Sequence, residues 1–249
     1  MRSARWRAPG RSRVFYRSAP RTFARPVPPL HAPSVLVLHF ESTRFVISVA
    51  ELAALNGAPL AMVPEVAFVG RSNAGKSTAI NVLTGQRQLA HASKTPGRTQ
   101  LLNFFEVPNR GPEGLPRTGA YLVDLPGYGF AKVDAPTRSR WDQLVGGYLA
   151  GRRLLRGVVI VMDARRPLAG ADEHLLAWIS GRSDAEALRV HLLLNKADQI
   201  ARPERARVVA QAEHRAESLP MPVSVQLFSG LKKEGVEELR LTLRQIIEG

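Results

Sequence analysis

The sequence predicts an α/β protein built on a six-stranded, mostly parallel sheet with helices on both faces. Two observations predict it. Short apolar runs alternate with amphipathic runs from about residue 64 to the end of the chain, which is typical of parallel sheets. Some of these runs, such as Gly157–Met162, contain no polar residue, as expected of strands covered on both faces.

The predicted elements follow from the periodicity of each stretch. The six strands are residues 65–69, 100–107, 119–124, 157–162, 190–194 and 223–228. The helices are residues 75–84, 136–149, 171–180, 203–217 and 234–247. Upstream, Phe45–Val49 is expected to be a short strand or extended segment, and Ala50–Leu55 a short helix at the domain edge. Residues 109–118 contain glycines and prolines and are expected to form a hairpin loop.

The bulk composition limits the class of protein. A chain of 249 residues can hold one sizeable α/β domain plus appendages. The absence of cysteine excludes disulfides and thiolate metal sites and implies no oxidising compartment. No apolar run approaches the roughly 18 residues of a membrane span. We therefore expect a cytoplasmic protein without an integral membrane segment.

The net charge of +14 is concentrated near the N-terminus. Residues 1–40 contain eight arginines and no lysine or carboxylate, which leaves about +6 for the remainder. We expect residues 1–40 to be a disordered basic extension, 41–63 an edge segment, and 64–249 the functional domain. The extension could be an organelle transit peptide, an arm that contacts RNA phosphates, or upstream sequence added by an early start codon. We favour the last.

One glycine-rich loop joins the first predicted strand to the first predicted helix. It is Gly70-Arg71-Ser72-Asn73-Ala74-Gly75-Lys76-Ser77, which matches the phosphate-binding P-loop in the context that this pattern requires. The two outer glycines let backbone N–H groups turn toward phosphate oxygens. Lys76 supplies a cation for the outer phosphates, and the Ser77 hydroxyl is placed to ligate Mg²⁺. A chance glycine-rich turn is the disfavoured alternative.

A second motif, Asp124-Leu125-Pro126-Gly127, ends the second predicted strand after this loop. Asp124 can hold Mg²⁺ through a water, and the Gly127 N–H can reach a γ-phosphate. By itself the pattern could be a strand-end turn. Its position downstream of a P-loop makes the functional interpretation strong.

A third motif, Asn195-Lys196-Ala197-Asp198, follows an apolar strand. The Asp198 carboxylate can accept hydrogen bonds from N1–H and the 2-amino group of guanine, which adenine lacks at that edge. Asn195 can bond N7 and tie neighbouring loops together, and the Lys196 stem can pack on the base. Such a site rejects the wrong base because its carboxylate would be left unpaired. The alternative is a surface Asn-Lys turn.

The order of these motifs, with Thr99 and Phe228-Ser229-Gly230, resembles the motif set of small GTPases. In detail the chain resembles the EngB family (also called YsxC or YihA) of ribosome-biogenesis GTP-binding proteins, in the TrmE-Era-EngA-EngB-Septin-like superfamily. The resembling stretches lie within about residues 45–249, and they are Gly70–Ser77, Ser93–Gln100, Asp124–Gly129 and Leu231–Gly235.

The resemblance implies roles for further residues. Switch I would be Gly97-Arg98-Thr99-Gln100-Leu101, with Thr99 joining Ser77 as a Mg²⁺ ligand. Switch II would be Asp124–Gly127, and Phe228–Gly230 would offer backbone N–H groups to the guanine carbonyl. Relatives often have Ser or Ala where Gly230 stands, and a backbone contact tolerates that difference. Catalysis of GTP hydrolysis would involve Lys76, Thr99 and Gly127.

Two residues refine the expected mechanism. Many GTPases orient the attacking water with a glutamine after the switch II glycine, and here that residue is Tyr128. We therefore expect slow intrinsic hydrolysis. Asn73 resembles the asparagine that helps hold K⁺ in potassium-stimulated relatives, although it could also be an ordinary loop residue.

The resemblance also implies a biological role, that of a monomeric switch in assembly of the large ribosomal subunit, with a link to cell division and septation. Seven basic residues could form a face for ribosomal RNA, or could be dispersed charges: Arg152, Arg153, Arg156, Arg165, Arg166, Lys232 and Lys233. A GTPase acting directly on division machinery or a membrane is one alternative. A kinase is another, disfavoured because Asn195–Asp198 indicates guanine.

Overall fold

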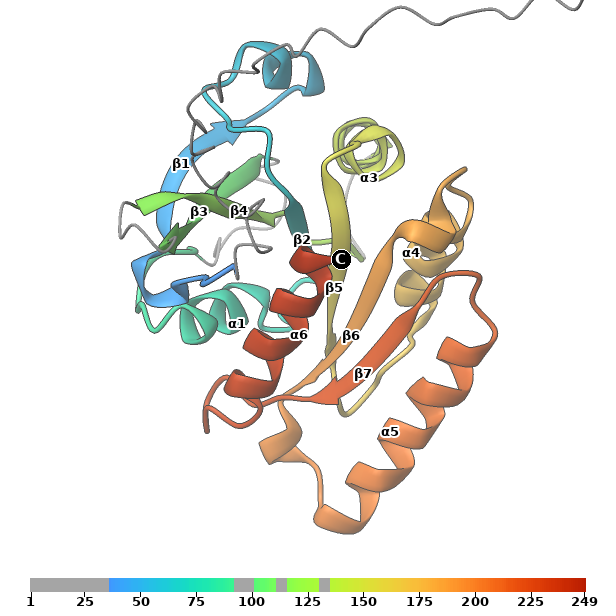
Figure 1. Ribbon diagram of the computed structural model, residues 1–249. Coiled ribbons are helices and arrows are strands. Elements are labelled where there is room, and N and C mark those ends of the chain that lie inside the picture. Colours follow the sequence, from blue (N-terminus) through green and yellow to red (C-terminus); the bar gives the residue numbers. More distant parts are fainter. Residues whose placement is uncertain (1–35, 92–100, 111–115, 130–134) are drawn as a thin grey trace, which may run out of the picture. The chain divides into compact units, whose positions relative to one another are not determined.

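A seven-stranded sheet forms the centre of the computed structural model, in the order β1-β3-β4-β2-β5-β6-β7 (Figure 1). The structure describes residues 36–91, 101–110, 116–129 and 135–249. The strands are β1 Arg44–Val49, β2 Glu65–Gly70, β3 Leu102–Arg110, β4 Pro116–Asp124, β5 Leu155–Asp163, β6 Arg189–Asn195 and β7 Val223–Leu227. The five strands from β4 to β7 run parallel, and β3 is antiparallel to both of its neighbours. The predicted fold class is confirmed, with seven strands instead of six.

The additional strand is β1, whose sequence left the choice between a strand and an extended segment. It pairs with β3 at the edge of the sheet, and only Val49 among its residues is buried. Because a half-exposed edge strand has few apolar residues in a regular pattern, the sequence alone did not distinguish a strand from an extended segment. The register with β3 shifts between Phe45 and Ile47, so β1 contains a bulge.

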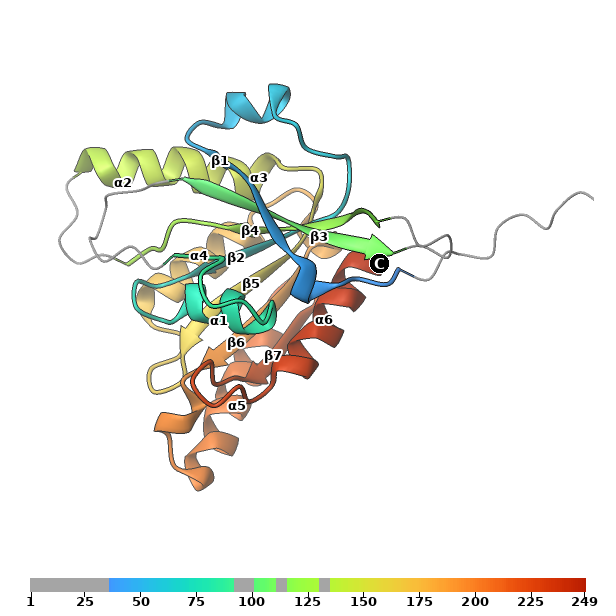
Figure 2. The ribbon, with the colours of Figure 1, turned by 90° about the vertical axis from the view of Figure 1, so that its left-hand side faces the viewer.

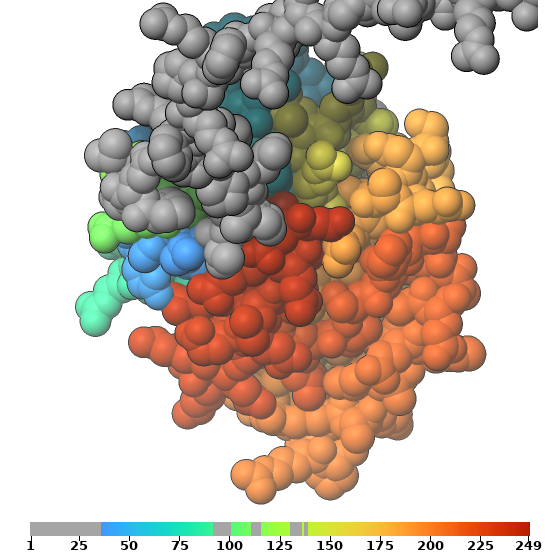
Figure 3. All heavy atoms as spheres, viewed as in Figure 1, coloured from blue at the N-terminus to red at the C-terminus, as the bar shows by residue number. Residues whose placement is uncertain are grey.

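Helices cover both faces of the sheet (Figure 2), and a separate apolar core lies between the sheet and the helices on each face. One core includes side chains of α3, α4 and α5; the other includes side chains of α1 and α6. The outer surface of α6 occupies the centre of the face in Figure 3. The α-helices are α1 Lys76–Leu83, α2 Ala135–Trp141, α3 Gly147–Gly151, α4 Gly170–Ser180, α5 Arg202–Glu217 and α6 Val236–Glu248. None of the helices in the described part of the chain combines the length and apolar character that a membrane crossing requires.

Two predicted segments differ in detail. The stretch predicted as one helix over 136–149 is α2 and α3 joined by a π-helical turn at Asp142–Gly146. The predicted helix at 50–55 is a 3₁₀ segment, Leu52–Gly57. Near the N-terminus, Leu38 and Phe40 are 3% and 1% exposed and belong to the core beneath α1 and α6. Packing thus begins before residue 41, where the sequence analysis drew its boundary.

The register of the parallel strands places their carboxyl ends side by side. Phe68 of β2 is opposite Asp124 of β4, and Asp163 of β5 is opposite Asn195 of β6. In open α/β sheets, ligands bind at this edge. The motifs found in the sequence therefore meet there.

Candidate nucleotide-binding site

The P-loop connects β2 to α1 and includes two residues with left-handed backbone, Asn73 at φ 65° and Gly75 at φ 94°. Glycine is required at residue 75 for two reasons: the backbone is left-handed, and a Cβ there would lie 2.3 Å from Asn195 Nδ2. A Cβ on Gly70 would lie 2.6 Å from the Val161 carbonyl oxygen. The backbone of this loop can take its path only with glycine at these two positions.

Lys76 and Asp124, predicted from separate motifs, form an ion pair at the carboxyl edge of the sheet. Their side chains are 13% and 6% exposed, so the pair is largely shielded from water. Ser77 follows in the first turn of α1. A serine hydroxyl and a carboxylate are hard oxygen donors, the type that Mg²⁺ prefers. The donor set in this part of the site fits a magnesium ion.

The switch II segment lies against the P-loop. The Leu125 N–H donates to the Phe68 carbonyl at 2.9 Å, which continues the pairing of β2 and β4. A Cβ on Gly127 would be 3.3 Å from the Gly70 carbonyl oxygen. Pro126, between them, is half-buried, and its carbonyl accepts a hydrogen bond from Trp141 Nε1 at 3.0 Å.

The Asn195 side chain connects the P-loop with the loops after β6 and β7, which are predicted to recognise the base. Its Nδ2 donates to the Ala74 carbonyl at 2.8 Å. Its Oδ1 accepts from the Gly230 N–H at 3.2 Å and from the Lys196 N–H at 2.8 Å. The residue is 3% exposed, so these bonds form away from water.

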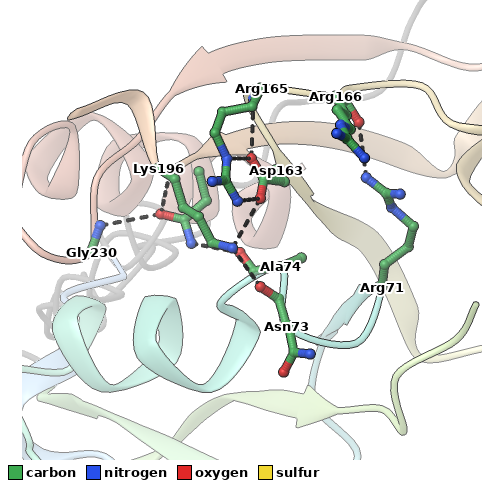
Figure 4. A network of polar contacts seen from close by, with 9 residues as sticks. Arg71, Asn73, Ala74, Asp163, Arg165, Arg166, Lys196 and Gly230 are labelled. Carbon is green, nitrogen blue, oxygen red and sulfur yellow. Dashed lines mark hydrogen bonds and ion pairs between the residues drawn. The ribbon is translucent and has the colours of Figure 1, made fainter. Parts of the chain in front are cut away.

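Lys196 contacts the P-loop through its ammonium group, which donates to the Asn73 carbonyl at 2.7 Å and to Asp163 Oδ2 at 2.9 Å (Figure 4). Asp163 is also held by Arg165, whose Nε donates to Oδ1 at 2.9 Å. The hydrogen bonds from Arg165 and Lys196 hold the pKa of Asp163 well below its usual range, although burial opposes them. Asp163 therefore remains ionised and fixes the Lys196 head group.

The remaining base-recognition residues lie at the ends of β6 and β7. The Ala197 N–H donates to the Phe228 carbonyl at 3.0 Å, and both side chains are fully buried. The Ser229 hydroxyl donates to Asp198 Oδ1. Asp198 and Phe228–Gly230 thus lie together. The N–H groups of Phe228, Ser229 and Gly230 donate to the Leu194 carbonyl, the Glu234 carbonyl and Asn195 Oδ1, so their predicted role toward guanine stays a prediction.

The predicted switch I falls almost entirely outside the described residues, since Gly97, Arg98, Thr99 and Gln100 are not among them. Leu101 is described and lies half-buried just before β3. The Mg²⁺ role of Thr99 stays a prediction.

Two residues near the phosphate loop direct their side chains elsewhere. Arg71 Nη2 donates to the Arg166 carbonyl at 2.9 Å (Figure 4). The Tyr128 hydroxyl donates to Asp172 Oδ1 at 2.7 Å. Any contribution of Arg71 to nucleotide binding would therefore come from its backbone.

Asp163 and Asp172 are site residues that the sequence motifs did not predict. Asp163 had a usable signal, because a carboxylate that ends an apolar strand is the same signal that identified Asp124. Asp172 had none, since an acidic residue in the first turn of a helix is ordinary capping chemistry.

Of the seven basic residues that could form one face, five lie around β5, and Lys232 and Lys233 follow β7. Arg152, Arg153 and Arg156 lie around the start of β5, whereas Arg165 and Arg166 follow its end. A strand of this length separates the two groups by roughly 25 Å. Arg152 is also committed to an ion pair with the buried Glu65. The five residues around β5 therefore do not form one compact basic cluster.

The sheet and the loops at its carboxyl edge define a P-loop GTPase, and a family model described as 50S ribosome-binding GTPase matches residues 65–196. The probable GTP-binding protein EngB of Cupriavidus taiwanensis is 44% identical over 209 residues, covering 80% of this chain and 83% of that protein. The corresponding protein of Neisseria meningitidis serogroup C is 44% identical over 208 residues, covering 82% and 90%. The chain belongs to the EngB family of GTP-binding proteins, as its motifs indicated.

Solved structures share the fold. A crystal structure of a probable GTP-binding protein engB superposes with a TM-score of 0.53 at 21% identity, covering 74% of this chain and 98% of that one. Era, in complex with MgGDPNP and nucleotides of 16S ribosomal RNA, superposes with a TM-score of 0.55 at 22% identity, covering 74% and 57%. At these identities the similarity concerns the fold alone.

Gly230 is more constrained in this chain than a backbone contact would require, because a Cβ there would lie 2.7 Å from Thr78 Cγ2. We expect Gly230→Ala to lower the free energy of unfolding by about 1 kcal/mol through overpacking, measured by urea denaturation. Adding Thr78→Ser removes the opposing methyl group and should restore most of the loss. Gly151→Ala, where a Cβ meets open space, is the control. Unchanged stability of the Gly230→Ala variant would show that Thr78 moves aside freely.

Proposed function

We propose that this GTPase binds GTP and GDP at the carboxyl edge of its sheet and alternates between two states as a monomeric switch in large ribosomal subunit assembly. The domain is residues 64–249, preceded by an edge segment that already packs into the core at Leu38 and Phe40 and, before that segment, by the basic extension. The observation that carries the proposal is the Asn195 bond to the Ala74 carbonyl at 2.8 Å. It joins the predicted phosphate loop to the predicted base loop in one site.

In this proposal the P-loop N–H groups bind the phosphates, and Lys76 leaves Asp124 to contact the outer phosphate oxygens. Ser77 and Thr99 ligate Mg²⁺ directly, and Asp124 holds it through a water. When bound, the ion neutralises charge on the phosphate oxygens. The Gly127 N–H contacts the γ-phosphate, so switch II distinguishes GTP from GDP.

The proposed base contacts use the loops that follow β6 and β7. Asp198, which accepts a hydrogen bond from Ser229, is the acceptor for guanine N1–H and the 2-amino group. Asn195 bonds N7, and the stem of Lys196 packs on the base with its head held by Asp163. The guanine carbonyl would meet the backbone of Phe228–Gly230, where the longest of the existing bonds is that of the Gly230 N–H to Asn195 Oδ1 at 3.2 Å, and this N–H would have to be shared with the base.

We expect hydrolysis to be slow, because the Tyr128 phenol is held by Asp172 at 2.7 Å and is not free to orient water. The matching family model is described as ribosome-binding, which supports the ribosome as partner and the cytoplasm as location. A role in cell division and septation would follow from ribosome assembly. A GTPase that acts on division machinery or a membrane without the ribosome is the competing function.

Base selectivity gives the first test. Asp198→Asn should weaken GTP binding at least about 100-fold, because an acceptor facing two guanine donors becomes partly a donor. Binding of xanthosine triphosphate should improve, as measured by calorimetric titration. Asp184→Asn, which neutralises a 55% exposed carboxylate paired with Arg182, is the matched control. If GTP affinity survives Asp198→Asn, the placement of guanine is wrong.

Potassium dependence tests Asn73. We expect GTP turnover to be faster in KCl than in NaCl at equal ionic strength, because the Asn73 side chain would help hold K⁺ near the phosphates. Asn73→Gly keeps the left-handed backbone at φ 65° and removes only the side chain, so the difference between the two salts should disappear. Identical wild-type rates in the two salts would remove K⁺ from the mechanism.

Ribosome binding is tested by cosedimentation with large subunits at raised salt, which suppresses contacts of the basic extension with RNA phosphates. The protein should pellet with a non-hydrolysable GTP analogue and remain in the supernatant with GDP. Asp198→Asn in the same analogue should stay in the supernatant. Cosedimentation that ignores the nucleotide, together with analogue-dependent binding to anionic vesicles, would favour the competing function.

A further inference from the structure

Asp172 is a fully buried carboxylate that the proposed chemistry does not use. It lies in the first turn of α4, where Oδ2 accepts a hydrogen bond from the Ala169 N–H at 3.0 Å. Its other oxygen, Oδ1, accepts from the Tyr128 hydroxyl at 2.7 Å and lies 3.4 Å from Arg71 Nε. One carboxylate thus contacts the P-loop arginine and the residue that follows Gly127.

The chemistry of these groups favours a stable contact. Burial and the neighbouring Asp172 raise the pKa of the Tyr128 phenol, so Tyr128 remains a hydrogen-bond donor. Burial raises the pKa of Asp172, and the Tyr128 hydrogen bond and the Arg71 charge offset this rise only in part. Arg71 is fixed from its far end by the Arg166 carbonyl at 2.9 Å. Because the guanidinium is charged, this bond is of the stronger, charge-assisted kind.

The backbone around Tyr128 is anchored to the P-loop at the same place. The Tyr128 N–H donates to the Gly70 carbonyl at 3.2 Å, and the Ser72 N–H donates to the Tyr128 carbonyl at 3.0 Å. On its other side, the Tyr128 ring packs edge-on against Trp141 with centroids 6.2 Å apart. Gly127 therefore lies directly beside a residue held through both its backbone and its side chain.

We propose that Asp172 is a positioning residue for switch II, which holds Tyr128 and thereby fixes the Gly127 N–H against the P-loop where a γ-phosphate arrives. The inference rests on the proposed function, because it takes Gly127 as the γ-phosphate contact. GDP lacks that phosphate. Loss of the Asp172 carboxylate should therefore weaken triphosphate binding selectively.

The test compares wild type, Asp172→Asn, Tyr128→Phe and Glu173→Gln as full-length proteins. Calorimetry measures the Kd of each for GDP and for the β,γ-imido analogue of GTP, with Mg²⁺ present. Asp172→Asn and Tyr128→Phe should each weaken analogue binding about fivefold, as loss of a hydrogen bond predicts, and change GDP binding less than about twofold. Glu173→Gln, the matched control, removes a charge from the same helical turn, but Glu173 faces Arg215 of α5 at 2.9 Å. This variant should leave the ratio of the analogue Kd to the GDP Kd unchanged.

Tryptophan emission provides a spectroscopic readout, because Trp141 Nε1 donates to the switch II carbonyl of Pro126. The emission difference between analogue and GDP should shrink in Asp172→Asn and persist in Glu173→Gln. Tyr128→Phe removes only the hydroxyl that bonds Asp172 and keeps both the aromatic ring and the Asp172 carboxylate. The inference can therefore still be tested if Asp172→Asn does not fold.

Three outcomes would overturn the inference: equal weakening of both nucleotides, no change in either, or tighter binding of the analogue. Equal weakening would mean that Asp172 only supports the fold. Failure of the wild type itself to bind guanine nucleotides would instead overturn the proposed function.

Discussion

The site depends on one buried amide, that of Asn195. Its two ends bind backbone groups of the P-loop and of the loop after β7, and Asn195 itself ends β6. One side chain thus holds together the loops that follow β2, β6 and β7. Each of those backbone groups would otherwise be buried without a partner, at a cost of about 1–3 kcal/mol. The close approach of Asn195 also explains why residue 75 is glycine, because a Cβ would not fit between the two residues. The geometry of the phosphate loop is therefore set partly from β6.

Much of the fold could be predicted because parallel strands buried on both faces leave an unmistakable sequence signal. β2, β5 and β6 are nearly continuous apolar runs, and α6 has a clear apolar face formed by Leu239, Leu243, Ile246 and Ile247. β1 was ambiguous because it lies half-exposed at an edge. The π-helical turn at Asp142–Gly146 could not be predicted because it keeps nearly helical backbone and apolar spacing. Within this turn, a Cβ on Gly146 would lie 1.9 Å from Trp178 Cζ2, so only glycine fits there.

The candidate site was predictable to the extent that backbone motifs define it. Gly70–Ser77, Asp124–Gly127 and Asn195–Asp198 each follow a strand, and the sheet brings them together. What could not be predicted was where long side chains point. Arg71 belongs to the P-loop by sequence but turns to Arg166 and Asp172, because a buried carboxylate on α4 attracts it. Such contacts join residues about 100 positions apart and leave no local pattern.

The bulge in β1 affects how copies of the protein meet. β1 is an edge strand, and Phe45 on it is 53% exposed, a combination that invites strand-to-strand association. The shift in register between Phe45 and Ile47 twists this edge and interrupts its row of free N–H and C=O groups. A second copy would find no continuous ladder to extend. An irregularity of a single residue thus makes this edge a poorer template for strand pairing than a regular strand would be.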